Sequence, residues 1–386
     1  MLYDRPLTGE QRRISQLNYN RFSAVNGASY MCLGETVIIL FAVKLSAPNF
    51  IVAVIGAMML LGFLLLPLGV IRTAQVGAAR SQADFWVCRN VAALLVAVSA
   101  LILPLSRELA WGTLLLGSFL FYGFRAAGVV MSQPLIGDIS SDTDRARLIA
   151  KSTGLFYGSG LAAMITISLV LSRYDNLWVL VGIIVAGACC GVTASTFIRK
   201  IDETSNIRRS AQAPLLPQLR EAFRDLTLRR QIYAGFMVNL GIIMMAPIAI
   251  LTMKRGYSVS DTQAILFSVI QFASAIAATQ ISGRITEKIG PRKVAIYAYT
   301  LIFPIWLIAP STVSSPWMWG LFILPFLLIG SMVVSAQNAM VHYFLMAVPK
   351  ERQVASSMFI SVVTGAAAGV TGMFAAGAIL KLAGRF

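Results

Sequence analysis

Ionisable side chains inside long apolar stretches are the residues of this chain that could most directly do chemistry. Glu35 lies in the apolar stretch 20–43, and Arg125 lies in the stretch 109–132. A charge in hydrocarbon costs several kcal/mol and usually faces a cavity or a partner. Partial dehydration raises the pKa of a carboxylate, whereas a nearby arginine lowers it, and alternation between the two can couple protons to transport. We therefore predict that Glu35 and Arg125 contact the solute or the coupling ion.

The two charges are expected at different depths in the membrane. At about 1.5 Å per residue, Glu35 lies roughly 20 Å from the inner end of its stretch, and Arg125 lies about 10–12 Å from the inner end of its own. A permanent ion pair between them is therefore not expected. The alternative for Glu35 is a side chain that reaches outward to the membrane surface or bonds to a neighbouring helix.

Uncharged polar side chains form a second group of candidates inside the apolar stretches. They are Asn26, Asn239, Gln271, Gln337 and Asn338. Amides of this kind often form hydrogen bonds between membrane helices, which is the interpretation we favour for each of them, with solute contact as the alternative. The single histidine and the four cysteines show no metal-ligand spacing. We expect no metal, no cofactor and no disulfide framework.

The composition defines the class of protein that must position these residues. Of 386 residues, 57% are hydrophobic and 12% are charged, whereas about a quarter of the residues of a soluble domain are charged. This composition excludes an ordinary soluble fold and a disordered chain. The apolar stretches contain no paired histidines, Asp-rich metal motif or serine–lysine pair, and the chain has no phosphate-binding loop. An enzyme or an ATP-driven pump is therefore not expected.

The apolar stretches predict an all-α polytopic membrane protein. A membrane-crossing helix needs about 20 apolar residues, and eleven stretches approach or exceed this length. They are about 20–43, 49–71, 86–104, 109–132, 152–171, 177–198, 232–253, 263–282, 294–310, 316–347 and 357–380. Most of the 32 basic residues lie on the side of the N-terminus, and Arg125 is the only one assigned to the interior of a stretch. The positive-inside rule then predicts a cytoplasmic N-terminus in the inner membrane.

The chain is predicted to consist of two related halves. A polar segment follows the sixth stretch and gives an N-terminal half 1–199, a cytoplasmic linker 200–231 and a C-terminal half 232–386. The loops before the fifth and eleventh stretches share the pattern R-x-h-A-x-S, where h is aliphatic, and we assign its arginines, Arg147 and Arg352, to the gating loops. Duplicated six-helix halves are a recurrent transporter design. Because the second half shows five stretches, we expect either a missing twelfth span or a true eleven-span protein.

The loop between the eighth and ninth stretches carries the most specific motif. It reads GRITEKIGPRK and resembles the signature loop of the major facilitator superfamily, Gly-x-x-x-Asp/Glu-Arg/Lys-x-Gly-Arg-Arg/Lys. The matching residues are Gly283, Glu287, Lys288, Gly290, Arg292 and Lys293. Glycines permit a tight turn and close helix approach, and the charges can contact neighbouring helix ends. In that family such contacts latch the inner gate, which is the role that the resemblance implies here.

The equivalent loop of the first half, residues 69–77, departs from the family pattern. Thr73 stands where the family has its acid. The resemblance then implies an inner latch that is weaker on this side or is built differently. Arg72, Arg80 and Asp138 are the candidate partners for such a latch.

A second, partial resemblance concerns the fourth stretch. Arg125 and Gly128 resemble the fourth-helix motif of the superfamily, in which an intramembrane arginine precedes a glycine-rich stretch. The usual glutamine–glycine pair is absent, and the fifth stretch, GLFYGSGLAAM, lacks the glycine–proline signature of the family's antiporters. These departures weigh against a drug/proton antiporter.

Together, the residues and the resemblance predict a secondary carrier that works by alternating access. A cation-driven symporter, with protons as the candidate ion, or a facilitator fits better than an antiporter. The expected solute is small and neutral, weakly polar or amphipathic, because the cavity offers few charges. We expect a monomer in a lipid bilayer that binds no nucleic acid. The alternative is a non-transporting receptor or relic of transporter origin, which the altered first-half loop keeps open.

Overall fold

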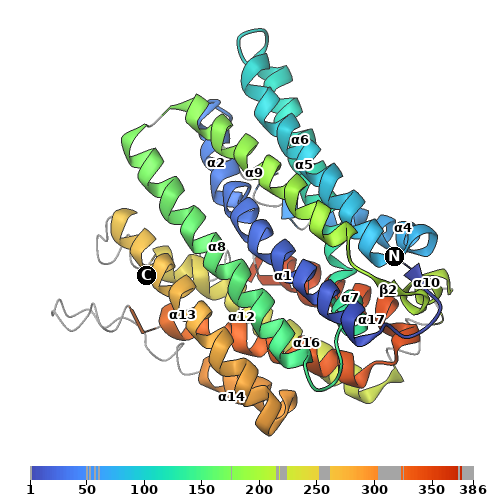
Figure 1. Ribbon diagram of the computed structural model, residues 1–386. Coiled ribbons are helices and arrows are strands. Elements are labelled where there is room, and N and C mark those ends of the chain that lie inside the picture. The colour runs from blue at the N-terminus through green and yellow to red at the C-terminus, as the bar shows by residue number, and fades with distance from the viewer. Residues whose placement is uncertain are drawn as a thin grey trace. The chain divides into compact units, whose positions relative to one another are not determined.

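In the computed structural model, the described residues are almost entirely helical (Figure 1). The described residues are 2–48, 61–174, 176–213, 224–251, 261–302 and 326–372, with a few single positions between and after these ranges. Within this part of the chain, six helices are long and apolar enough to cross a membrane. They are Gly9–Lys44, Ala78–Ile102, Arg107–Ile139, Arg145–Arg173, Leu177–Arg199 and Gln353–Gly372. The prediction of an all-α polytopic membrane protein is confirmed, whereas the count of eleven spans stays a prediction because several predicted spans fall partly outside the described residues.

The chain divides into two compact units. The N-terminal unit comprises Met1–Leu215 and Lys350–Ser357, and the C-terminal unit comprises Leu216–Pro349 and Met358–Phe386. The first residues of the predicted linker therefore belong to the N-terminal unit. The domain boundaries expected from the sequence stay a prediction.

Long helices make up most of the N-terminal unit. They are α1 (Gly9–Cys32), α2 (Glu35–Lys44), α5 (Ala78–Ile102), α6 (Arg107–Val129), α8 (Arg145–Arg173) and α9 (Leu177–Arg199). The shorter elements are η1 (Gly62–Leu65), α4 (Leu66–Val76), α7 (Ser132–Ile139) and α10 (Ser205–Gln212). Thr8 and Gln11 form a capping box before α1, which satisfies backbone donors at the helix start. For this reason α1 begins well before the apolar stretch predicted from residue 20.

Small residues let the helices of this unit approach closely. A methyl group on Gly27 of α1 would overlap the backbone at Phe156 of α8, and one on Gly191 of α9 would overlap the side chain of Asn90 of α5. Apolar side chains of α2, α5, α6 and α9 form a shared core. Such close contacts are typical of membrane bundles, in which van der Waals packing and interhelical hydrogen bonds drive association.

The segment after α9 folds back onto the N-terminal arm. β1 (Leu2–Tyr3) and β2 (Glu203–Thr204) form a two-stranded parallel sheet. The hydroxyl of Ser15 in α1 bonds to the backbone of Asp202, and Arg209 of α10 pairs with Asp4 at 3.0 Å. The beginning of the predicted linker is therefore docked on the N-terminal unit.

Four α-helices and two π-helical turns make up most of the described part of the C-terminal unit. They are α12 (Leu226–Leu251), α13 (Asp261–Ile289), α14 (Pro291–Ile302), η4 (Ile329–Val333), α16 (Val334–Ala347) and η6 (Ser361–Ala367). Between α16 and η6 lie η5 (Lys350–Arg352) and α17 (Gln353–Ile360), and the boundary between the units falls within α17, after Ser357. Gly330 of η4 lies so close to the backbone of Gln271 in α13 that a methyl group there would overlap it.

Candidate functional site

A fully buried arginine occupies the interior of the N-terminal unit. Arg89 of α5 is only 1% exposed. Its Nη2 donates to the hydroxyl of Ser29 in α1 at 3.0 Å, and that hydroxyl donates to the carbonyl of Gly187 in α9 at 2.8 Å. The guanidinium carbon lies 4.9 Å from the ring centre of Trp86 and 5.5 Å from that of Phe121 in α6. The cation is thus held between α1 and α6.

The groups that the structure places against the charge of Arg89 are aromatic rings. An arginine at the centre of a membrane helix costs about 3 kcal/mol, and a desolvated cation–π contact contributes about 2 kcal/mol, so the two rings can offset the charge. They do not satisfy the N–H donors, because Nε has no hydrogen-bond partner among the described residues. A buried donor without an acceptor costs about 1–3 kcal/mol. The arrangement therefore favours an incoming group that carries an acceptor.

Arg125, the arginine predicted from the sequence, lies close to this cluster. It is half-buried in α6, one helical turn after Phe121. Its guanidinium carbon lies 4.9 Å from the ring centre of Tyr30 in α1. Tyr30 directly follows Ser29, the hydrogen-bond partner of Arg89. Neighbouring residues of α1 therefore contact two arginines, one on α5 and one on α6.

Sequence reasoning missed Arg89. It was counted among the basic residues at the cytoplasmic edge of the stretch 86–104, and the expectation that Arg125 is the only interior arginine is wrong. α5 begins at Ala78, so Arg89 lies roughly 16 Å along the helix. The run Phe-Trp-Val-Cys immediately before this arginine was the available signal, because four apolar residues ahead of a charge place it inside the stretch.

Asn26 belongs to the polar cluster around Arg89. The amide oxygen of Asn26 in α1 accepts a hydrogen bond from Nε1 of Trp86 at 2.8 Å. This bond joins α1 to α5 and orients the ring that stacks on Arg89.

Glu35 is the first residue of α2, after α1 ends at Cys32. The side chain of Glu35 lies outside the described residues.

The amides predicted in the second half are spread over the C-terminal unit. Asn239 of α12 donates its Nδ2 to the carbonyl of Thr364 in η6 at 2.8 Å. Gln271 is half-buried in α13, Gln337 is exposed on α16, and the adjacent Asn338 is half-buried. The bond of Asn239 is the interhelical type that the sequence favoured, and solute contact stays a prediction for all four amides.

The signature-like loop of the second half forms a tight turn between two helices. α13 ends at Ile289, Gly290 adopts a φ of +86°, and α14 begins at Pro291. A positive φ favours glycine, and proline suits the first position of a helix. The charged residues of the motif, Glu287, Lys288, Arg292 and Lys293, are exposed at this turn, and Gly283 is buried in α13. Arg292 also lines a cavity of about 220 Å³ beside Tyr343.

The two copies of the sequence repeat have similar surroundings. Arg147 lies in the first turn of α8 and Arg352 directly precedes α17, and both are exposed. The alanine and the final serine of each copy are buried; these are Ala150, Ser152, Ala355 and Ser357. The shared residues thus mark equivalent helix starts, and the gating role of the arginines stays a prediction.

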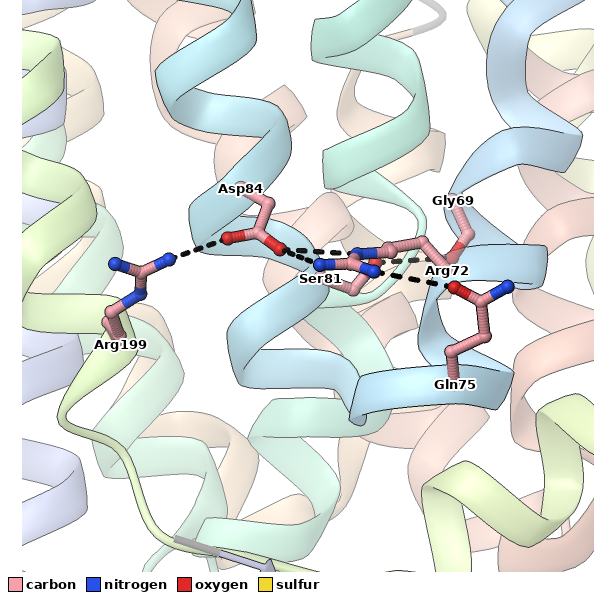
Figure 2. A network of polar contacts seen from close by, with 6 residues as sticks. All are labelled: Gly69, Arg72, Gln75, Ser81, Asp84 and Arg199. Carbon is pink, nitrogen blue, oxygen red and sulfur yellow. Dashed lines mark hydrogen bonds and ion pairs between the residues drawn. The ribbon is translucent and has the colours of Figure 1, made fainter.

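Charges from outside the first-half loop hold it in place (Figure 2). Thr73, in the position of the family's acid, donates its hydroxyl to the carbonyl of Gly69 at 2.8 Å. Arg72 pairs with Asp84 of α5 at 2.8 Å, and Asp84 also pairs with Arg199 at the end of α9 at 2.8 Å. Asp84 therefore connects α4 to α9 and is the acid that binds Arg72.

Asp138, which the sequence offered as a partner for this loop, binds the linker. Its carboxylate accepts from the backbone N–H and from the hydroxyl of Thr204, the latter at 2.6 Å. The adjacent Glu203 accepts from the first two N–H groups of α5 at 2.8 and 3.1 Å. Gly77, just before them, has a φ of +91° and no side chain to cap the helix. Glu203 therefore supplies a carboxylate where the loop 69–77 has none.

Two acids outside the spanning helices have shifted pKa values: Glu203 of the linker and Asp144, which directly precedes α8. Burial raises the pKa of Glu203 from 4.5 to about 7; Asp138 adds to this effect, and the two backbone hydrogen bonds oppose it. Burial also acts to raise the pKa of Asp144, but hydrogen bonds from Gln16 and Ser141 bring it below its ordinary value. Glu203 can thus change its charge near neutral pH, whereas Asp144 stays ionised there.

Comparison with known proteins identifies the family. Residues 83–373 match the Major Facilitator Superfamily, and no curated protein sequence matches the chain. A bacterial homologue of the iron transporter ferroportin, in an outward-facing state, superposes with a TM-score of 0.75 at 14% identity, over 95% of this chain and 92% of that chain. The proton:xylose symporter XylE gives 0.65 at 12% identity, over 97% and 96%. The human organic anion transporter MFSD10 gives 0.63 at 14% identity, over 95% and 93%. At these identities the structures show a shared fold, and the sequence match over most of the chain shows that this protein belongs to the Major Facilitator Superfamily.

Proposed function

We propose that this protein is a secondary carrier that moves a small solute across the inner membrane by alternating access. Its membership of a transporter superfamily supports transport. The choice of site rests on the fully buried Arg89, whose Nε donor has no hydrogen-bond partner among the described residues. The similar structures are named for iron, xylose and organic anions, so the fold does not select the solute.

The solute that suits this site offers hydrogen-bond acceptors. Arg89 and Arg125 both stack on aromatic rings, which keeps two cations in the same part of the N-terminal unit. A hydroxyl or a single carboxylate of the solute can accept from the Nε donor of Arg89. The aromatic rings already offset part of the positive charge of both arginines, so the cluster suits a solute of low charge better than a multiply charged anion. We therefore propose a small polar solute with at most one negative charge.

Glu35 is the proposed coupling residue, with the N-terminus in the cytoplasm. It starts α2 directly after the break between α1 and α2, so a local rearrangement at the break could change its exposure to water. A carboxylate that alternates between dry and wet surroundings alternates between its protonated and its ionised form. This alternation would take up a proton in one state of the carrier and release it in the other.

Uptake into proteoliposomes tests the proposal. The purified chain is assayed with a panel of sugars, amino acids and monocarboxylates, with and without an inward proton gradient. We expect gradient-driven uptake that Glu35→Gln abolishes and that Arg89→Gln lowers about tenfold or more, the loss of one hydrogen bond to a charged group. Arg173→Gln is the matched control, because Arg173 is an exposed arginine at the end of α8.

Other outcomes would refute separate parts of the proposal. Uptake that is the same with and without the proton gradient, and in the wild type and Glu35→Gln, would show that the protein is a facilitator and that Glu35 has a structural role. Uptake that Arg89→Gln leaves unchanged would place the solute site elsewhere. If no solute moves, the alternative of a non-transporting receptor becomes the better proposal. The observation that favours this alternative is Thr73, because its hydroxyl binds its own helix at the position where the family has a gating acid.

A further inference from the structure

The N-terminal unit carries an open, basic cavity at the ends of α4, α5 and α9. Its volume is about 800 Å³. The charged residues that line it are Arg72, Arg80, Asp84, Arg199, Lys200 and Asp202. Arg89 and Arg125 are not among its lining residues, so this cavity is separate from the proposed solute site. It lies on the side that the basic residues predict to be cytoplasmic.

Positive charge exceeds negative charge in this cavity, with four basic and two acidic side chains. Asp84 lies between Arg72 and Arg199 and pairs with both at 2.8 Å (Figure 2). Because one carboxylate serves two guanidinium groups, each arginine keeps unused N–H donors. The side chains of Arg80 and Lys200 are exposed and form no ion pair within the described part of the chain. The cavity can therefore bind a further anion.

Each of the same three helices also carries an exposed apolar side chain one or two turns from a residue that lines the cavity. Leu68 lies one turn from Arg72 on α4 and is 41% exposed. Val91 lies two turns from Asp84 on α5 and is 57% exposed, and Val192 lies two turns before the end of α9 and is 38% exposed. Residues one or two turns apart share a helix face. A molecule in the cavity that also covers these side chains must have a charged end and an apolar end.

We propose that this cavity binds an anionic phospholipid, with the phosphate at Arg199, Lys200 and Arg80 and an acyl chain along the apolar side chains. Guanidinium groups bind phosphate oxygens through paired N–H donors, and basic pockets between membrane helices on the cytoplasmic side suit anionic headgroups. A free phosphate ion would bind the same cations but would leave the exposed side chains of Leu68, Val91 and Val192 uncovered. These apolar side chains are the reason to favour a lipid.

Lipid binding to the purified full-length chain tests this proposal. The protein in a neutral detergent is titrated with dioleoyl phosphatidylglycerol, and the dissociation constant is measured by native mass spectrometry. At about one kcal/mol per basic residue, we expect Lys200→Gln to weaken binding about fivefold and Arg199→Gln with Lys200→Gln to weaken it about 30-fold. Lys151→Gln is the matched control, because Lys151 is an exposed lysine in α8 that does not line the cavity.

Further measurements distinguish a lipid phosphate from a soluble phosphate, or show that the cavity is not the binding site. Dioleoyl phosphatidylcholine should bind weakly and equally to all variants. Phosphatidylglycerol affinity that is the same in the wild type and the double variant would overturn the proposal. Glycerol phosphate or inorganic phosphate that binds as tightly as the lipid, with the same loss in the variants, would make this a site for soluble phosphate. If circular dichroism shows that the double variant misfolds, the dissociation constant of the single variant Lys200→Gln tests the proposal by itself, because Lys200 is exposed.

Discussion

Glu203 is the residue whose charge should most clearly control the docking of the linker. Its side chain is 2% exposed, and its two oxygens accept from the first two N–H groups of α5 at 2.8 and 3.1 Å. Burial, aided by Asp138, raises its pKa from 4.5 to about 7. Because the folded state holds this proton more tightly than the unfolded state, its contribution to stability is full below pH 4.5 and is lost as the pH rises through about 7. The docked state is therefore expected to open more easily in alkaline than in mildly acidic buffer.

The size of the effect follows from the two pKa values. A difference between 4.5 and about 7 corresponds to about 2–3 kcal/mol across the window from pH 5 to pH 8. The equilibrium constant for opening of this contact should thus rise roughly 50- to 100-fold over that window. Glu203→Gln cannot ionise, so the variant should lose this pH dependence.

Hydrogen exchange of the peptide around Ala78 is the direct assay. Protection of the first amides of α5, corrected for the pH dependence of intrinsic exchange, should fall between pH 5 and pH 8 in the wild type and stay constant in Glu203→Gln. Asp144→Asn is the control, because the lowered pKa of Asp144 keeps its contribution constant across this window. Equal pH dependence in the wild type and in Glu203→Gln would refute the assignment of this titration to Glu203.

Three further substitutions test an ion pair, a turn and a buried hydrogen bond. Asp84→Asn should lower stability by about 1 kcal/mol or less, because its arginine partners are 43% and 63% exposed; the melting temperature should show a loss that disappears in high salt, and a loss independent of salt would contradict an electrostatic origin. Gly290→Ala should cost about 1–2 kcal/mol because its φ of +86° disfavours any side chain, and an unchanged melting temperature would contradict the turn geometry. Trp86→Phe should cost about 1–3 kcal/mol, because it leaves the buried acceptor of Asn26 unpaired; a variant as stable as the wild type would show that this bond contributes little.

The fold class and the family could be predicted because both rest on local signals. An apolar stretch of about 20 residues needs no distant partner to be recognised as a span. The loop from Gly283 to Lys293 likewise contains its own turn chemistry, since Gly290 supplies the positive φ and Pro291 starts the next helix. Local signals were weaker at span edges, which is why α1 extends well beyond its predicted start and why Arg89 was placed outside the membrane.

The partners of the charged residues could not be predicted, because most of them lie far away in the sequence. Arg199 meets Asp84, and Asp138 meets Thr204, and nothing near either residue in the sequence indicates these pairs. The sequence shows the linker only as a polar segment with excess positive charge. Its docking depends on hydrogen bonds between backbone groups and buried acids, which leave no trace in charge or hydropathy.

The first-half loop shows how such distant contacts can change the meaning of a missing motif residue. Thr73 alone suggests a weakened loop, because a hydroxyl cannot replace the charge of an acid. The structure places two other carboxylates at the same loop: Asp84 binds Arg72, and Glu203 caps the helix that follows Gly77. Glu203 thus ties the start of α5, directly after this loop, to the linker. The absence of an acid at position 73 is therefore weaker evidence for a non-transporting relic than the sequence alone suggests, since Asp84 still binds Arg72 and Glu203 still caps the helix that follows the loop.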